Sequence, residues 1–117
     1  FVITALGAPL SAGTTTIPSL LTPTQSNPGV NQFGINLVAN SNPGIGLDPE
    51  GVWANATTAP DYGQADRYKF IDGDIVASSP NVSLMKKFTV SYIVNVSPSL
   101  KAGVYTTTIN FVASGRF

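Results

Sequence analysis

The last third of the chain contains two long segments in which apolar and polar residues alternate. The first covers residues 87–97 and the second residues 104–113, and the residues 98–103 between them, Pro-Ser-Leu-Lys-Ala-Gly, are typical of a turn. A period of two places successive side chains on opposite faces of a strand. The pattern therefore predicts an antiparallel β-hairpin, with Ile109 and Phe111 on one face of its second strand.

Shorter segments of strand character occur earlier in the chain. Residues 44–64 are instead rich in Gly, Pro and acidic residues, which predicts a long irregular loop. The side chains expected to point inward from the clearest short strand, residues 32–39, are Phe33, Ile35, Leu37 and Ala39. The other predicted strands are residues 1–6, 14–18, 67–70 and 74–77, the last two joined by a hairpin turn at Asp72-Gly73.

These segments predict an all-β fold. No window shows the apolar spacing of a helix without an intervening Gly or Pro. A chain of 117 residues makes one domain with enough length to bury a core. We therefore predict a single antiparallel β-sandwich over residues 1–117, immunoglobulin-like or jelly-roll and pilin-like, with seven or eight strands.

Composition narrows the class of function. The chain has no cysteine and no histidine, which removes disulfides, Cys/His metal sites and the usual acid/base group. Its formal net charge is zero, so nothing favours binding to nucleic acid. No apolar run is long enough for a membrane span. With 10% charged residues, against about 25% in a typical domain, we expect an extracellular, cell-surface protein without catalytic activity, cofactor or metal.

The N-terminal segment is a candidate subunit-contact strand. Residues 1–6 are apolar, and Gly7–Gly13 contains strand breakers, so residues 1–13 could form a donated strand with its hinge. A sandwich that lacks one strand must accept one to cover its core. The sequence leaves open whether this strand pairs in its own subunit or in the next. The residues expected to make the contact are Phe1, Val2, Ile3 and Leu6.

All six acidic residues lie between positions 48 and 74, whereas most basic residues lie outside this stretch. An acidic loop region that meets the basic end of a neighbouring subunit would set the register of an assembly. The sequence Asp72-Gly-Asp74 also resembles part of a calcium site, but a hairpin turn takes the same residues. We expect a turn here, and no metal.

Two further sets of residues are candidates for surface recognition. Exposed aromatic side chains on sandwich loops can stack on sugar rings, although a single tryptophan in such a fold more often covers the core. The candidate ligand aromatics are Trp53, Tyr62 and Tyr68. The Asn-X-Ser/Thr sequons, which are glycosylated only in a source that modifies asparagine, are at Asn55, Asn81 and Asn95.

Several segments together resemble a family of secreted bacterial surface proteins, often from reduced-genome lineages. The segments are residues 33–40, 68–70, 75–78, 88–96 and 102–111. The resemblance covers roughly residues 32–113 and implies a cell-surface β-sandwich with no known enzymatic activity. The final Ala-Gly-x-Tyr-x-x-Thr motif, Ala102 to Thr108, is similar to the last strand of spore-coat-U-like and archaic chaperone-usher pilins, which usually carry a cysteine pair that this chain lacks.

The sequence thus predicts a structural subunit of an extracellular filament, pilus or surface layer, assembled by β-strand complementation between copies. Its partners would be further copies of itself or neighbouring surface proteins. The alternative is a monomeric adhesive or carbohydrate-binding module, and it requires that Trp53, Tyr62 and Tyr68 be exposed together on one loop surface.

Overall fold

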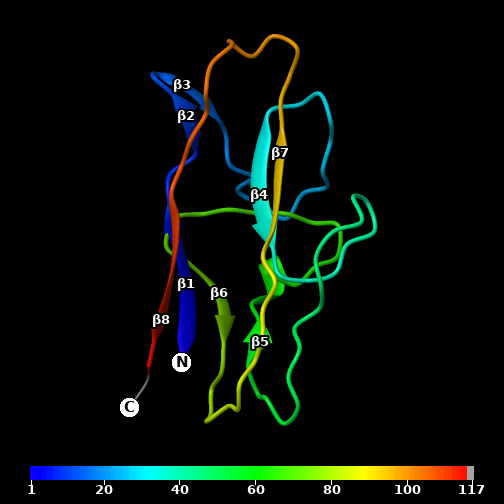
Figure 1. The fold of residues 1–117 in the computed structure, drawn as a ribbon, viewed down its shortest axis with the longest axis vertical. Coiled ribbons are helices and arrows are strands. Elements are labelled where there is room, and N and C mark those ends of the chain that lie inside the picture. Colours follow the sequence, from blue (N-terminus) through cyan, green and yellow to red (C-terminus); the bar gives the residue numbers. More distant parts are fainter. Residues whose placement is uncertain (116–117) are drawn as a thin grey trace.

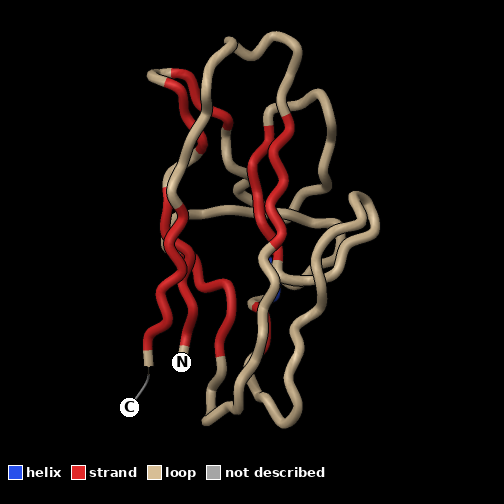
Figure 2. The backbone as a smooth tube through the Cα atoms, viewed as in Figure 1, coloured by secondary structure: helices blue, strands red, loops and turns tan. Residues whose placement is uncertain are grey.

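The computed structural model describes residues 1–115, and the fold is all-β, as predicted. The described part contains eight strands and one short 3-10 helix, η1 (Figures 1 and 2). Their bounds are β1 (Val2–Gly7), β2 (Leu10–Ala12), β3 (Thr15–Ile17), β4 (Gln32–Asn36), β5 (Thr57–Thr58), η1 (Pro60–Tyr62), β6 (Asp74–Ser78), β7 (Ser91–Asn95) and β8 (Ile109–Ser114). No helix in residues 1–115 is long and apolar enough to cross a membrane.

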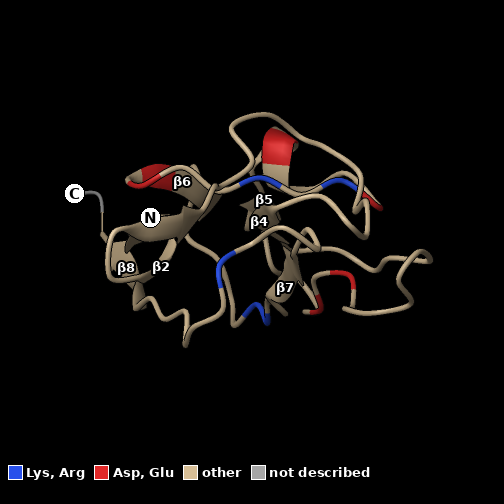
Figure 3. Ribbon diagram, turned by 90° about the horizontal axis from the view of Figure 1, so that it is seen from above, with Lys and Arg blue, Asp and Glu red and all other residues tan. Residues whose placement is uncertain are grey.

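The strands form two main layers that face each other (Figure 3). One layer, sheet A, has the antiparallel order β5-β6-β1-β8, and the other contains the antiparallel pair β4-β7. The small hairpin β2-β3 lies at one end. The core between the layers is made of Ala5, Ile17, Phe33, Ile35, Leu37, Tyr62, Phe70, Val76 and Ala77.

Strand β4 is buried along its whole length, although the alternation of its sequence predicts one buried face. Irregular segments pair with the edge of β4 that faces away from β7. The amide of Ile35 donates to the carbonyl of Lys69 at 3.0 Å, and the amide of Phe33 donates to the carbonyl of Pro18 at 3.0 Å. Leu37 is buried as expected, whereas Ala39 lies beyond the strand and is exposed, contrary to the prediction.

The predicted pairing of the last two strands is wrong. β7 pairs with β4, and β8 pairs with β1, so the two strands lie in different layers. Both strands are also shorter than predicted. The connection between them crosses from one layer to the other, and it is attached on the way by mutual backbone hydrogen bonds of Ser11 and Thr106 at 3.1 and 3.0 Å.

The predicted hairpin around Asp72-Gly73 is also wrong. Tyr68 pairs with Thr24 and Lys69 with Ile35, whereas β6 pairs with β1 and β5. The turn therefore links the two layers. Gly73 has a φ of 88°, a backbone conformation that favours glycine.

Candidate subunit interface

Strand β1 completes the sheet of its own chain in this structure. It is paired on both edges, with Val2 opposite Ser78 of β6 and opposite Ser114 of β8. The N-terminal amine donates to the carbonyl of Ser79 at 2.9 Å, and the amide of Ser79 donates to the carbonyl of Phe1 at 2.9 Å. Donating β1 to a neighbour would require both ladders to open.

The side chains of β1 divide between the two faces of sheet A. Ile3 packs against the core, and Ala5, which the sequence did not single out, is fully buried. Phe1 and Val2 are half-buried, and Leu6 is 38% exposed. Of the four predicted contact residues, only Ile3 packs against the core cluster.

The segment Gly7–Gly13 is not the free hinge that its breakers suggest. Only Ala8 and Pro9 separate β1 from β2. The Oγ1 of Thr107 donates to the carbonyl of Ala8 at 2.6 Å, and a Cβ on Gly7 would lie 2.7 Å from the carbonyl oxygen of Thr108. The segment therefore packs closely on the connection that leads into β8.

The side of the sandwich between β7 and β8 is open. Among the described residues β7 pairs only with β4, and β8 pairs only with β1, so each strand has one edge without a partner strand. Figure 3 shows both strands on the same side of the two layers. Unpaired N–H and C=O groups along such an edge are a template for a further strand.

Core-facing side chains of β7 are uncovered along this open side. The register places Val94 opposite Phe33 and Tyr92 opposite Ile35, so these side chains lie on the face that contains two fully buried core residues. Nevertheless Tyr92 is 48% exposed and Val94 is 50% exposed. The layer opposite does not reach far enough to cover them.

Strand β8 also has a core-facing side chain that is partly uncovered. Phe111 lies opposite the buried Ala5 and is nevertheless 38% exposed. Between the two strands is a hollow of about 330 Å³, which we call the inner hollow. It is lined by Leu10, Phe33, Tyr92, Val94, Thr107 and Ile109.

A second depression, the outer hollow, borders β7 on its other side. Its volume is about 430 Å³, and loops around Ser26 and Asn42 form its wall with Pro43, Ile45 and the strand itself. The edge of β7 therefore lies between two hollows. This arrangement suits an added strand, whose alternate side chains point to opposite sides.

Three of the acidic residues accept hydrogen bonds from backbone amides. Asp66 accepts hydrogen bonds from the amides of Asn42 and Ser41 at 2.8 and 2.9 Å and from the hydroxyl of Ser41 at 2.8 Å. These bonds, chiefly that from the Asn42 amide, lower the pKa of the Asp66 carboxyl. Asp72 accepts from the amide of Gly7 at 2.9 Å, and Asp48 from the amide of Ala39 at 3.0 Å. Within residues 1–115 no three acidic side chains are grouped so as to hold a metal ion.

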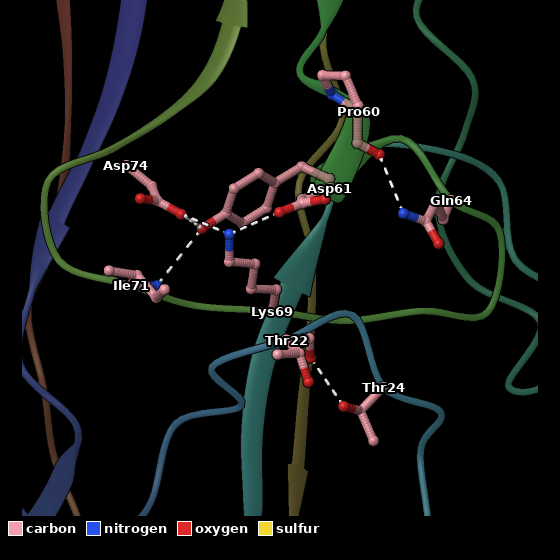
Figure 4. Close-up of polar contacts among 9 residues, drawn as sticks. Thr22, Thr24, Pro60, Asp61, Gln64, Lys69, Ile71 and Asp74 are labelled. Carbon is pink, nitrogen blue, oxygen red and sulfur yellow. Dashed lines mark hydrogen bonds and ion pairs between the residues drawn. The ribbon is translucent and has the colours of Figure 1, made fainter.

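Two further acidic residues, Asp61 and Asp74, surround Lys69. Its Nζ lies 2.8 Å from Oδ2 of Asp61 and 3.0 Å from Oδ2 of Asp74 (Figure 4). Burial acts to lower the pKa of Lys69, but hydrogen bonds to the two carboxylates and their charges outweigh burial and raise it. This cluster is not among the sites predicted from the sequence, although a lysine between Tyr68 and Phe70 in an acidic stretch is a signal for it.

The three candidate ligand aromatics do not form one surface. Trp53 is 84% exposed, whereas Tyr62 and Tyr68 are buried at 1% and 0% exposure. The hydroxyl of Tyr62 donates to Asp74 at 2.8 Å, and Tyr68 lies beneath Gly34, where a Cβ would approach the Tyr68 Cβ to 2.9 Å. The two tyrosines therefore belong to the interior, and the condition for the carbohydrate-binding alternative is not met.

The three sequons lie in different surroundings. Asn81 is exposed, and Asn55 is exposed with its amide donating to the carbonyl of Val82 at 2.9 Å. Asn95 is half-buried on β7, and its amide donates to Ser26 and Gln32 at 2.9 and 3.0 Å. A glycan on Asn95 would displace these bonds.

The chain matches no family model, no curated protein and no solved structure.

Proposed function

We propose that the protein is a structural subunit of an extracellular filament or surface layer, in which copies join by β-strand complementation. The supporting observation is the open side, where two strand edges without partners flank core-facing side chains that are about half exposed. An added strand would pair with the free backbone groups and cover the apolar row at the same time.

In this proposal β8 of one copy supplies the strand that the β7 edge of the next copy lacks. The two strands have similar lengths, six and five residues. In this pairing, Phe111 and Ala113 of β8 would point toward the inner hollow of the neighbour, and Asn110 and Val112, which alternate with them, would point toward the outer hollow. Strand β1 stays in its own sheet, so its two ladders remain closed.

The contact joins two different edges and is therefore heterologous. A heterologous contact that does not close on itself continues from copy to copy and produces a filament. The sparse charge of the chain supports this arrangement, since the lining of the inner hollow contains no charged side chain that an apolar strand would bury. The low charge and the absence of cysteine and histidine fit a structural role at the cell surface, which is part of the proposal.

Negative-stain electron microscopy and sedimentation of the full chain over a range of concentrations test this function. We expect filaments, with a concentration-dependent distribution of oligomers in solution. A closed dimer would overturn the filament, because the two open sides would then cover each other. A folded monomer at high concentration would overturn assembly altogether, and a glycan array with Trp53→Ala as the control would then test the adhesive alternative.

A further inference from the structure

The environment of Lys69 has a second chemical consequence besides charge pairing. The lysine side chain is 11% exposed, and its Nζ contacts one oxygen of each of two carboxyl groups, at 2.8 Å in Asp61 and 3.0 Å in Asp74 (Figure 4). One carboxylate is sufficient to neutralise one ammonium group. The second leaves the cluster with a net negative charge and with a spare proton acceptor beside the amine.

A buried tyrosine acts on one of these carboxyl groups. The hydroxyl of Tyr62 donates to Oδ2 of Asp74 at 2.8 Å, and the ring of Tyr62 lies beside the lysine, 5.4 Å from Nζ to the ring centroid. Burial of Tyr62, followed by its hydrogen bond to Asp74, raises its pKa, so the phenol keeps its proton and remains a donor. A fixed donor on a carboxyl oxygen stabilises the negative charge that forms there during nucleophilic attack.

We propose that Lys69 and Asp74 condense to an amide bond within the chain, with Asp61 as the proton carrier. The inference does not depend on the proposed function.

The reaction balances with the groups present. Lys69 is charged before the reaction, because the two carboxylates raise the pKa of its amine. The reaction begins when Asp61 takes a proton from this ammonium group, and the free amine then attacks Cγ of Asp74. A bond forms between Nζ and Cγ, and the charge that develops on Oδ2 is stabilised by the hydroxyl of Tyr62. Asp61 passes this proton to the other oxygen of Asp74, then takes a second proton from Nζ of the adduct and passes it to the same oxygen. That oxygen leaves as water while the double bond between Cγ and Oδ2 forms again. No oxidant or further reactant is required, and holding the amine against the carboxyl group supplies the proximity that such a condensation needs in water.

Asp74 is the better acceptor of the two carboxyl groups. It lies on β6, its side chain is 28% exposed, and it has the Tyr62 hydrogen bond, whereas the side chain of Asp61 is 51% exposed. Asp61 also borders the open cleft of about 290 Å³ through which water would leave. The resulting bond would join β6 in sheet A to the segment that pairs with β4, because Lys69 is hydrogen-bonded to Ile35. The bond would therefore fasten one layer of the sandwich to the other.

Intact-mass spectrometry of the purified full chain, fresh and after prolonged incubation at neutral pH, tests the proposal. We expect a mass lower than the calculated one by one water molecule, and we expect Lys69→Arg, which keeps the charge but cannot condense, to show the full mass. After trypsin digestion the linked protein should give an uncut peptide of residues 68–86, because the modified Lys69 resists cleavage. Asp61→Ala should leave most of the protein at full mass, since the proton carrier is missing.

Two outcomes of these measurements would refute the proposal or part of it. A wild-type protein that keeps its full mass and is cleaved after Lys69 would overturn the proposal, and this outcome does not depend on whether any variant folds. A bond from Lys69 to Asp61 would join residues 1–67 to residues 68–86 and would overturn the assignment of Asp74 as acceptor. Assembly into filaments is measured separately, so the two proposals can fail independently.

Discussion

Replacing Val94 by lysine is the most direct perturbation of the open side. Val94 is 50% exposed in the single chain, so a lysine there can extend its ammonium group into water at little cost to folding. In the proposed assembly the same position is covered by β8 of a neighbouring copy. The substitution should therefore weaken association much more than it weakens the fold.

The size of the effect follows from burial and charge. Complete burial of a valine side chain stabilises by roughly 1.5–3 kcal/mol, so covering the exposed half of Val94 is worth about 1 kcal/mol. A polar group left buried without a partner costs about 1–3 kcal/mol more, and the inner hollow has no carboxylate to pair with lysine. Together these give about 3 kcal/mol, which corresponds to a roughly hundredfold weaker association.

Sedimentation velocity over a concentration series measures this change, and urea unfolding at low concentration measures the stability of the single chain. Val82→Lys is the matched control, because Val82 is 92% exposed in the loop between β6 and β7 and lines neither the inner nor the outer hollow. We expect Val94→Lys to shift the midpoint of association by about two decades and Val82→Lys to leave it unchanged. Equal association of both variants and the wild type would refute the placement of the interface between β7 and β8.

Three other predictions concern β1, the core and the acidic loops. Thr4 of β1 lies opposite Val112 of β8, and the chain has no cysteine of its own. A variant with both Thr4→Cys and Val112→Cys should therefore form a disulfide within one chain. A ladder of linked chains on a non-reducing gel would instead show that β1 is exchanged between copies. Gly34→Ala should lower the free energy of unfolding by about 1–3 kcal/mol, because the new Cβ would lie 2.9 Å from Cβ of Tyr68. The control Gly44→Ala should be tolerated, because the nearest atom to its new Cβ is 3.9 Å away. Equal urea midpoints for the two variants would contradict this. Because the pKa of Asp66 is lowered in the folded protein, the contribution of this carboxylate to stability is complete above the ordinary aspartate pKa of about 4 and is lost as the pH falls through the lower folded pKa. Asp66→Asn should therefore flatten the acid side of a plot of urea midpoint against pH. An unchanged slope would argue against the three hydrogen bonds at Asp66.

The positions of several strands could be predicted from the sequence, because alternation is a local property. β1, β3, β4 and β6 lie where the apolar spacing places them. Their pairing could not be predicted in this way. The segments around β7 and β8 have turn residues between them, yet each finds its partner elsewhere, since pairing depends on which edges other parts of the chain leave free.

The proposed interface and the lysine cluster were harder to predict for a related reason. Burial of Tyr62 and Tyr68 depends on loops from distant parts of the sequence, and alternation within a loop says nothing about them. One signal was present at Gly34, because a glycine within a strong strand pattern often marks the close approach of another backbone. Uncovered side chains such as Val94 can be recognised only when the opposite layer is known.

The pairing of β1 with β8 brings Val2 opposite Ser114, residues from the two ends of the described chain. Sheet A therefore cannot close during synthesis until β8 has emerged, because β8 is the last strand of the described residues and pairs with the first. Until then β1 lacks a partner on one edge and exposes apolar side chains, a condition in which β-rich chains aggregate. This order delays the closure of sheet A until late in synthesis, so a holding chaperone would be most effective during that interval.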